Sequence, residues 1–491
     1  MGKNLIASFS PSSRTAATFL LLFIPAGASE FTDREPFLVK PYLQLGNAPR
    51  LSPAEVAMLV WHTPDTDAKW NVEVKPSDGG PWFEVSYFRW RRIAVETMET
   101  HRIYRWWLTR LRPGREFDYR VLRNGHVVFA ARGKARKASA QPLRFAVFGD
   151  CGTNTPPQKA IAYRAWKVQP DFVVIPGDVI QLSGRLSEYR THFFPIYNAD
   201  EPSPEAGAPL LRSVLFFAAL GNHDAGNPDL DAYPDGGGYY AYWFLPTHGP
   251  VADQRGPHVI ALQGEEKRLR AFMDASDGKF PRMGTYSFDY GNSHWTILDS
   301  NAYVDYTDYC LRNWIARDLA AAEGSSWKFV AFHEPPFNSS TVESRNQRMR
   351  LLADVFEQGG VDMVFSGHVH TYQRSVPLKF LPKPGADGTV RGANWGRGGD
   401  WTVNGDFTLD RSFDGMRNTK ASGVIYIISG AGGRNPVTPE QTGKPSTWQA
   451  FTTKFIANTN SLTVADLDGR TLQVRQIAAS GEELDRFTVT K

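Results

Sequence analysis

The sequence is poor in cysteine, with only two in 491 residues. Two thiols cannot build a disulfide-rich scaffold or a zinc site with four thiolate ligands. An excess of one charge is also missing, because the formal net charge is only +4 and no block of like charge forms a tail. This argues against a dedicated electrostatic DNA binder. Apolar runs of the roughly 20 residues that a membrane-spanning helix needs are absent as well.

What the composition does contain is typical of a folded, sheet-rich protein. Hydrophobic residues make up 42% of the chain, which is enough for a large core and excludes disorder over the whole length. The 43 glycines and 33 prolines require many structured turns, and an aromatic content of 13% favours sheets over helical bundles. The length predicts two or three domains.

Residues 1–28 have the features of a signal peptide. A positively charged start precedes a short apolar run at 16–24, and small residues at Ala26 and Ala28 form an Ala-x-Ala-type cleavage site. The alternative is a membrane anchor, but the run is too short to span a bilayer, which takes roughly 20 residues. We therefore expect the segment to be removed, which leaves a secreted or periplasmic protein with no membrane attachment.

The two cysteines, Cys151 and Cys310, leave two alternatives open. Export would place them in an oxidising compartment, where they could form one disulfide. They could equally remain as two buried free thiols, because nothing in their spacing indicates that they meet.

Residues 36–141 are predicted to form an all-β domain. Apolar and polar residues alternate at 70–74, as in a strand with one buried face. The Asn124-Gly125 pair between apolar residues is a strong hairpin signal. The segment contains roughly seven short strand signals, which favours a β-sandwich. The polar, basic stretch 132–141 is interpreted as a linker.

Residues 142–491 show a different pattern, in which strands alternate with helices. The predicted strands lie at 143–148, 172–175, 214–220, 329–332 and 361–365, and the predicted helices at 157–168, 309–323 and 345–358. Residues 466–491 return to strand and turn signals. Alternating strands and helices predict an α/β sheet, whose ligands bind at the carboxyl ends of the strands.

Polar side chains with metal-ligand chemistry follow these strands directly, usually beside a glycine. They are Asp150, Asp178, Asn222, His333, His368 and His370. Oxygen and imidazole donors without a thiolate suit zinc, manganese, iron or magnesium. Six ligands are too many for one tetrahedral zinc and suit two ions that share a carboxylate. Two ions about 3.5–4 Å apart form a clamp for in-line displacement at phosphorus.

Each of these signals is weak when taken alone. A Gly-Asp pair after a strand is usually a turn, Asn222 could be a helix cap, and a lone histidine such as His333 is more often structural. The Gly367-His368-Val369-His370 unit is more specific, because histidines two positions apart share one face of an extended segment. The combination at five strand ends is what favours a metal site.

The combination resembles the calcineurin-like metallophosphoesterases, and within them the purple acid phosphatase branch. The motifs that carry the resemblance are Asp150-Cys151-Gly152, Gly177-Asp178, Gly221-Asn222-His223-Asp224, Val330-Ala331-Phe332-His333 and Gly367-His368-Val369-His370. The resemblance covers nearly all of the chain after the signal peptide. It implies an α/β fold, an αββα sandwich at 142–491, preceded by a fibronectin-type, immunoglobulin-like β-sandwich at 36–141.

The resemblance also implies how two metal ions would be held. One ion would take Asp150, Asp178 and His370, and the other would take Asp178, Asn222, His333 and His368, with Asp178 bridging. One position departs from the family pattern, because Gln181 stands where the family has a metal-binding tyrosine. A ferric-tyrosinate site is therefore not expected. We predict a colourless protein whose ions are iron, zinc or manganese.

The activity implied by the resemblance is that of an exported dinuclear-metal phosphatase, a metal-dependent phosphoric ester hydrolase that acts on phosphate monoesters through a metal-bridging hydroxide. His223 is predicted to donate a proton to the leaving group, since imidazole exchanges protons near neutral pH. Asp224 is a candidate to orient His223, and the alternative is that Asp224 caps the next turn. The predicted partner is a small phosphorylated substrate, with no specific nucleic acid.

Other functions stay open at this stage. The same metal core could serve a phosphodiesterase or nucleotidase, and the chain could be a non-catalytic extracellular binding protein. Two positions near the site also depart from the family, where Glu343 and Gln373 replace expected residues.

Tryptophans and arginines alternate at 89–92 and 102–110 in the β-sandwich. They are either a surface for an anionic polymer or arginine stems covering aromatic rings, and base rates favour the second. His294 is expected to pack within a strand.

Overall fold

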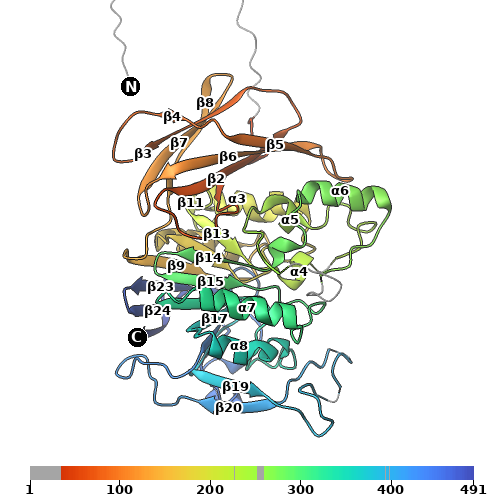
Figure 1. The fold of residues 1–491 in the computed structure, drawn as a ribbon, viewed down its shortest axis with the longest axis vertical. Helices are drawn as coiled ribbons and strands as arrows, with labels where there is room; N and C mark the ends of the chain where they lie inside the picture. Colours follow the sequence, from red (N-terminus) through yellow and green to blue (C-terminus); the bar gives the residue numbers. More distant parts are fainter. Residues whose placement is uncertain (1–34, 226, 251–258, 393, 398) are drawn as a thin grey trace, which may run out of the picture. The chain divides into compact units, whose positions relative to one another are not determined.

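The computed structural model describes residues 35–225, 227–250, 259–392, 394–397 and 399–491 (Figure 1). The predicted signal peptide at 1–28 lies outside these ranges. Residues 36–491 belong to one contact unit. Among the helices of the described ranges, none combines the length and apolar character that crossing a membrane would require.

The N-terminal part consists of two four-stranded antiparallel sheets, ordered β1-β2-β6-β5 and β4-β3-β7-β8 (Figure 1). The strands are β1 (Val39–Gln44), β2 (Glu55–Pro64), β3 (Trp70–Pro76), β4 (Phe83–Glu84), β5 (Phe88–Ile93), β6 (His101–Leu111), β7 (Glu116–Arg123) and β8 (His126–Lys134). Between the sheets the rings of Trp61 and Trp106 stack with centroids 4.8 Å apart. Asn124 and Gly125 both have positive φ and join β7 to β8, which confirms the predicted hairpin.

The stretch 132–141, predicted to be a linker, instead continues strand β8 and contributes a buried arginine. Strand β8 extends to Lys134, and Arg136 is only 2% exposed. The guanidinium of Arg136 pairs with Glu55 on β2 at 2.5 Å and donates to the carbonyl of Asp289. A basic stretch looks solvent-exposed in sequence, but here one arginine is needed inside to balance a buried glutamate.

Two further sheets form the α/β part. The first has the order β13-β10-β9-β23-β24-β25, from β9 (Leu143–Val147), β10 (Phe172–Ile175), β13 (Leu215–Ala218), β23 (Ser461–Asp468), β24 (Thr471–Ala478) and β25 (Glu483–Thr490). The second has the order β14-β15-β16-β17-β21-β18-β22, from β14 (Tyr286–Tyr290), β15 (Ser293–Ile297), β16 (Trp327–Ala331), β17 (Met363–Ser366), β18 (Tyr372–Ser375), β21 (Ile425–Ser429) and β22 (Thr452–Ile456). Strands β9, β10 and β13 run parallel, as do β15, β16, β17 and β21.

Aromatic side chains fill the space between these two sheets. Phe145 of β9 contacts Trp295 of β15 and Phe365 of β17, with ring centroids 5.0 and 6.0 Å apart. Phe217 of β13 stacks on Phe288 of β14. Since buried aromatic rings bring large apolar areas out of water, this layer holds the sheets face to face.

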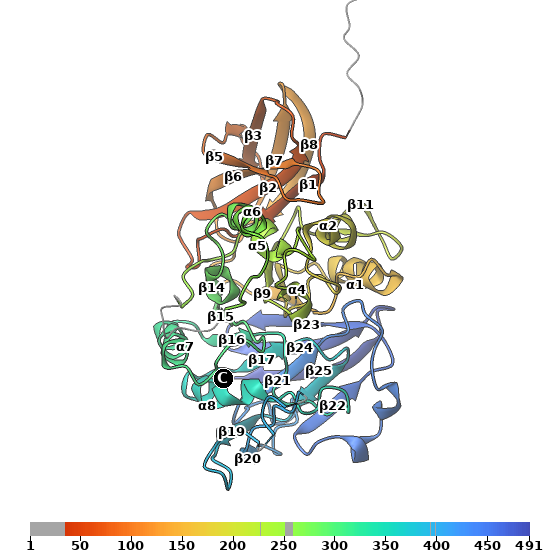
Figure 2. The same cartoon turned by 90° about the vertical axis from the view of Figure 1, so that its right-hand side faces the viewer.

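The described ranges of this part contain eight α-helices. They are α1 (Pro156–Lys167), α2 (Leu186–Glu188), α3 (Phe194–Tyr197), α4 (Asn222–Ala225), α5 (Gly238–Tyr242), α6 (Glu266–Ser276), α7 (Tyr309–Ala321) and α8 (Ala353–Gln358). Helix α1 contacts β23 of the first sheet, and α7 contacts β15 of the second, so the two helices lie on different sides (Figure 2). The layers are therefore helix, sheet, sheet, helix, as predicted. Two hairpins complete the part, β11 (Asn198–Ser203) with β12 (Gly207–Pro209) and β19 (Leu378–Pro382) with β20 (Gly405–Leu409).

One predicted helix is shorter than expected. The sequence predicts a helix over 345–358, whereas the structure has a 3-10 turn over Arg348–Leu352 followed by α8. The backbone N–H of Gln347 donates to the carbonyl of Trp401. That contact uses the backbone of the expected first turn for pairing with a distant loop.

Candidate metal centre

The six predicted ligands all lie where strands of the two sheets end. Asp150, Asp178 and Asn222 follow the parallel strands β9, β10 and β13 of the first sheet. His333 follows β16, and the pair His368 and His370 follows β17, both in the second sheet. The carboxyl edges of parallel strands meet at one end of each sheet, so the face-to-face packing brings both sets together.

Four of these residues form a tight group. The Nε2 atom of His333 lies 2.9 Å from the side-chain oxygen of Asn222 and 3.3 Å from a carboxylate oxygen of Asp178. The Nδ1 atom of His368 lies 3.0 Å from the same Asn222 oxygen and 3.3 Å from Nε2 of His333. These are the four residues that the family resemblance assigns to one ion.

The remaining two residues lie beside this group. Nε2 of His370 is 3.6 Å from a carboxylate oxygen of Asp150. Asp150, Asp178 and His333 each offer a ligand atom, and these atoms lie within 4.8 Å of one another. Asp178 therefore faces both halves of the set, which is the position a bridging carboxylate requires.

When His333 is neutral, the nitrogen and oxygen atoms of this group are better suited to binding a cation than to forming hydrogen bonds with one another. Nδ1 of His333 lies 3.0 Å from the carbonyl oxygen of Pro176, so in the neutral ring it carries the proton and Nε2 presents a lone pair. That lone pair faces the oxygens of Asn222 and Asp178, which are also acceptors. Among the described residues beside the group, Gln181 has its Oε1 atom buried without a hydrogen-bond partner. Clustered acceptors and an unpaired buried amide oxygen are typical of a site that takes a metal ion.

The backbone at these positions is strained in a way that favours function over stability. Asp150, Asp178 and His368 have φ values of 60°, 49° and 67°, in the left-handed region that non-glycine residues rarely adopt. Such residues cost on the order of 1–3 kcal/mol each and cluster at functional sites. Gly221 has no room for a side chain, because a Cβ there would clash with Asp178.

The charges of Asp178 and His333 depend on each other. Burial alone would raise the pKa of Asp178, but the neighbouring His333 lowers it to about 2. Burial alone would lower the pKa of His333, but Asp178 raises it to about 9. Without an ion the pair is thus held as carboxylate and imidazolium. A metal ion must displace that proton, so its affinity for the site depends on pH.

His223 and Asp224 are adjacent in sequence but have different surroundings. The backbone N–H of His223 donates to Asp178, and its Nε2 lies 4.0 Å from the same carboxylate while its side chain is 37% exposed. Its Nδ1 lies 3.0 Å from the carbonyl of Leu182. Asp224 is buried and accepts backbone hydrogen bonds from Val179, Ile180 and Gly221. Its oxygens hold the loop that carries Asp178.

Burial, followed by the charge of Asp178, raises the pKa of Asp224 to about 7. The three backbone donors oppose this shift, since they stabilise the carboxylate.

Three other side chains complete the surroundings. The amide nitrogen of Gln181 donates to Asp178 at 2.9 Å. The carboxylate of Glu343 lies 3.8 Å from Nε2 of His368, on the side away from Asn222. The hydroxyl of Ser300 accepts from the backbone N–H of His333. Ser300 escaped sequence reasoning, because a serine after a strand carries no distinguishing pattern.

The two cysteines are both free, Cys151 buried and Cys310 exposed. Burial raises the pKa of the Cys151 thiol well above its ordinary value. Cys151 is thus a neutral, buried residue inside the first ligand motif.

Comparison with known proteins gives a consistent picture. Residues 143–372 match the family "Calcineurin-like phosphoesterase". Purple acid phosphatase 15 of Arabidopsis thaliana is 26% identical over 252 residues, which cover 48% of this chain and 42% of that protein. Purple acid phosphatase 23 of the same plant is 36% identical over 248 residues, 48% of either protein. The matched region therefore spans less than half the length of these relatives.

Solved structures support the fold over a wider range. A purple acid phosphatase from yellow lupin (Lupinus luteus) seeds superposes with a TM-score of 0.62, covering 92% of this chain and 74% of that one at 16% identity. The structure of PhoD superposes with a TM-score of 0.54, covering 94% of this chain and 90% of that one at 12% identity. Both identities are low, so these two superpositions establish the fold alone.

Proposed function

We propose that the chain, whose residues 143–372 belong to the calcineurin-like phosphoesterase family, is a phosphoric ester hydrolase of the purple acid phosphatase type. One observation carries the proposal. Ring nitrogens of His333 and His368 and side-chain oxygens of Asn222 and Asp178 lie close together, at separations of 2.9 to 3.3 Å. Nitrogen and oxygen ligands lie at this spacing when they share one metal ion.

The proposed ligand sets are those assigned by the motifs. Asp150, Asp178 and His370 hold one ion, and Asp178, Asn222, His333 and His368 hold the other. Iron, zinc or manganese suits these donors. Bound ions supply Lewis acidity toward the phosphoryl oxygens and a water acidic enough to act as nucleophile. Gln181 takes the place of a tyrosine, so the loaded protein is expected to be colourless.

His223 is proposed as the proton donor to the leaving oxygen. It projects from the start of α4, is partly exposed, and lies next to the bridging Asp178 at 4.0 Å. The carbonyl of Leu182 fixes Nδ1, so Nε2 is the atom that faces the substrate side. Asp224 is given a supporting role, in which it anchors the loop of Asp178 through backbone amides.

Phosphate monoesters are the proposed substrates, and phosphodiesters are a second candidate favoured by Glu343. Its carboxylate stands 3.8 Å from His368 and is half exposed. A negative charge at this distance opposes a dianionic monoester more strongly than a monoanionic diester. The strength of this repulsion determines which ester is preferred.

Export remains part of the proposal. It is supported by the charged start, the short apolar run at 16–24 and the small residues at Ala26 and Ala28. Expression of the full chain followed by N-terminal sequencing of the exported product tests it. We expect a new N-terminus near Ser29, and an intact Met1 would contradict export by cleavage.

A metal-reconstitution series tests the catalytic proposal. Metal-free protein is loaded with iron, zinc or manganese, its metal content is measured by elemental analysis, and hydrolysis of nitrophenyl phosphate and bis-nitrophenyl phosphate is followed across pH. We expect two ions per chain and hydrolysis that requires them. Asp67→Asn, at a carboxylate whose side chain is 96% exposed, is the matched control. Two bound ions without hydrolysis of either ester would support a non-catalytic binding protein instead.

A further inference from the structure

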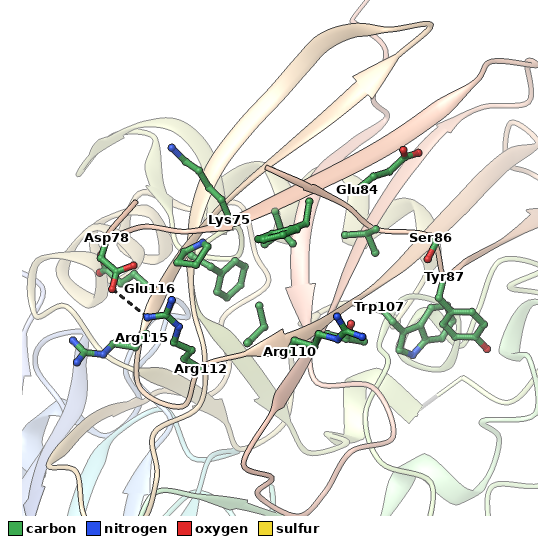
Figure 3. Close-up of a pocket in the computed structure, with 17 residues that line it drawn as sticks. Lys75, Asp78, Glu84, Ser86, Tyr87, Trp107, Arg110, Arg112, Arg115 and Glu116 are labelled. Carbon is green, nitrogen blue, oxygen red and sulfur yellow. Dashed lines mark hydrogen bonds and ion pairs between the residues drawn. The ribbon is translucent and has the colours of Figure 1, made fainter. Parts of the chain in front are cut away.

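A cavity of about 540 Å³ opens in the N-terminal sandwich, between its two sheets and outside the metal centre (Figure 3). Its lining comes from β3, from β4 and the residues after it, from β6 and from the start of β7. Ligand pockets generally have volumes of roughly 300–1,000 Å³, so this cavity is large enough for a small organic molecule.

The floor and one wall of the cavity are apolar. Phe117 and Leu111 are buried at its base. Phe83 and Tyr87 lie in its wall although they are 56% and 52% exposed, and Trp107 stands beside Tyr87 with ring centroids 4.6 Å apart. Three aromatic rings left open to solvent at one cavity are the usual lining of a site that holds a flat apolar group.

Among the charged side chains on the rim of the cavity that form no ion pair, positive charges outnumber negative ones. Arg112 pairs with Asp78 at 3.4 Å. In the part of the chain that the structure describes, Arg110 and Arg115 have no acidic partner. By contrast, the neighbouring arginines at 91, 92, 102 and 105 are all ion-paired. Of these two, Arg110 lies beside Trp107, whereas Arg115 lies at the opposite end of the cavity (Figure 3).

The backbone of β6 is irregular at one of these cations, Arg110. Glu55 pairs with Leu111 and Ala57 pairs with Leu108, so two residues of β6, Thr109 and Arg110, oppose a single residue of β2. This is a β-bulge, a device that re-aims a side chain. Arg110 also has a φ of 60°, in the left-handed region that a long side chain rarely adopts. The sandwich thus keeps a local irregularity at the residue that places a guanidinium on the rim.

We propose that this cavity binds an organic anion, a molecule with one or two rings and a single anionic group at one end. The rings lie against the aromatic wall of Phe83, Tyr87 and Trp107, and the anionic group is held by Arg110. Guanidinium groups bind carboxylate, sulfonate and phosphate alike through paired N–H donors. The site is separate from the metal centre and needs no metal.

The test uses naphthalene-2-sulfonate as the probe, with binding to the full chain measured by calorimetry. We expect Arg110→Gln to weaken binding about tenfold, the effect of losing one charge-assisted contact. Arg115→Gln should bind as the wild type does, because Arg115 lies at the opposite end of the cavity (Figure 3). Phe83→Ser should weaken binding comparably to Arg110→Gln, and all three positions are exposed enough for the variants to fold. Rising ionic strength should weaken binding to the wild type, because the attraction is screened. Arg317→Gln, at an exposed arginine of α7, is the matched control and should bind as the wild type does.

Two further probes separate the parts of the proposal. Neutral 2-naphthalenemethanol and inorganic sulfate should each bind more weakly than the sulfonate. Equal binding of the alcohol would overturn the role of Arg110, and equal binding of sulfate would overturn the role of the rings. Sulfonate binding that is unchanged in Arg110→Gln, or absent from the wild type, would overturn the proposal as a whole.

Discussion

Arg136 provides a sharp test of how the sandwich is joined to the α/β part. Its guanidinium pairs with Glu55, and both side chains are only 1% exposed. It also donates to the carbonyls of Pro49, Arg50 and Asp289, the last of which lies in β14. The perturbation is Arg136→Met, which keeps the length of the side chain and removes its charge.

The magnitude follows from what the change leaves behind. Removing one partner of a buried ion pair costs about 3–5 kcal/mol, because the other charge stays buried and uncompensated. The stranded glutamate can instead take up a proton, which costs an ordinary carboxyl about 3.7 kcal/mol at pH 7. We therefore expect Arg136→Met to lower the free energy of unfolding by about 4 kcal/mol at pH 7. The penalty should shrink by about 1.4 kcal/mol for each pH unit between pH 7 and about pH 5, since proton uptake becomes easier.

The assay is urea unfolding followed by tryptophan fluorescence at several pH values. Arg132→Met is the control on the same segment, because its side chain is 55% exposed and its pairing with Asp118 should contribute less than about 1 kcal/mol. The double variant Glu55→Met/Arg136→Met should recover about 2 kcal/mol of the loss, since it strands no charge. A loss below about 1 kcal/mol in Arg136→Met, or a double variant less stable than the single one, would refute this reasoning.

Four further outcomes are expected. His223→Ala should lower turnover about 10²–10⁴-fold while two ions stay bound, and loss of metal in elemental analysis would make His223 a ligand. Asp178→Asn should lose both ions, and retention of either one would exclude a bridging role. Glu343→Gln should raise the ratio of monoester to diester hydrolysis, and an unchanged ratio would separate Glu343 from substrate choice. Burial lowers the pKa of His294, but the hydrogen bonds that its ring donates to the carboxylates of Asp289 and Asp318 raise the pKa by more, so the net shift is upward. Its stabilising effect is full below about pH 6.5 and is lost as pH rises through the raised pKa. His294→Gln should therefore flatten the fall of unfolding midpoint above that pH, and an unaltered profile would contradict the assignment.

The strands, and the places of the six candidate ligands at the strand ends, were predictable because each depends on a local pattern. Apolar runs ended by glycine and a polar residue correspond to strands that stop at the sheet edge, as at Asp150 and Asp178. The hairpin at Asn124-Gly125 was predictable for the same reason, since two adjacent residues that tolerate positive φ define the turn. His294 also lies in a strand, β15, as expected.

Features that depend on distant partners were not predictable. The fate of Arg136 is set by Glu55, 81 positions away, so its burial leaves no trace in the local composition. Asp224 resembles a partner of His223 because the two are adjacent in sequence, yet Asp224 accepts from backbone amides while the ring of His223 contacts the carbonyl of Leu182. The bulge in β6 beside the cavity is also hidden, because a strand pattern of period two cannot reveal it.

The place of β9 has a consequence for the newly made chain. This strand carries Asp150 at its end, and it is flanked by β10 on one side and by β23 on the other, with Val147 paired to Thr463. A ribosome releases β9 long before β23, which begins only at Ser461. Until then β9 presents an open row of backbone donors and acceptors, which favours pairing with other chains. A strand far along the chain therefore closes an edge that a chaperone, or export in an unfolded state, would have to protect.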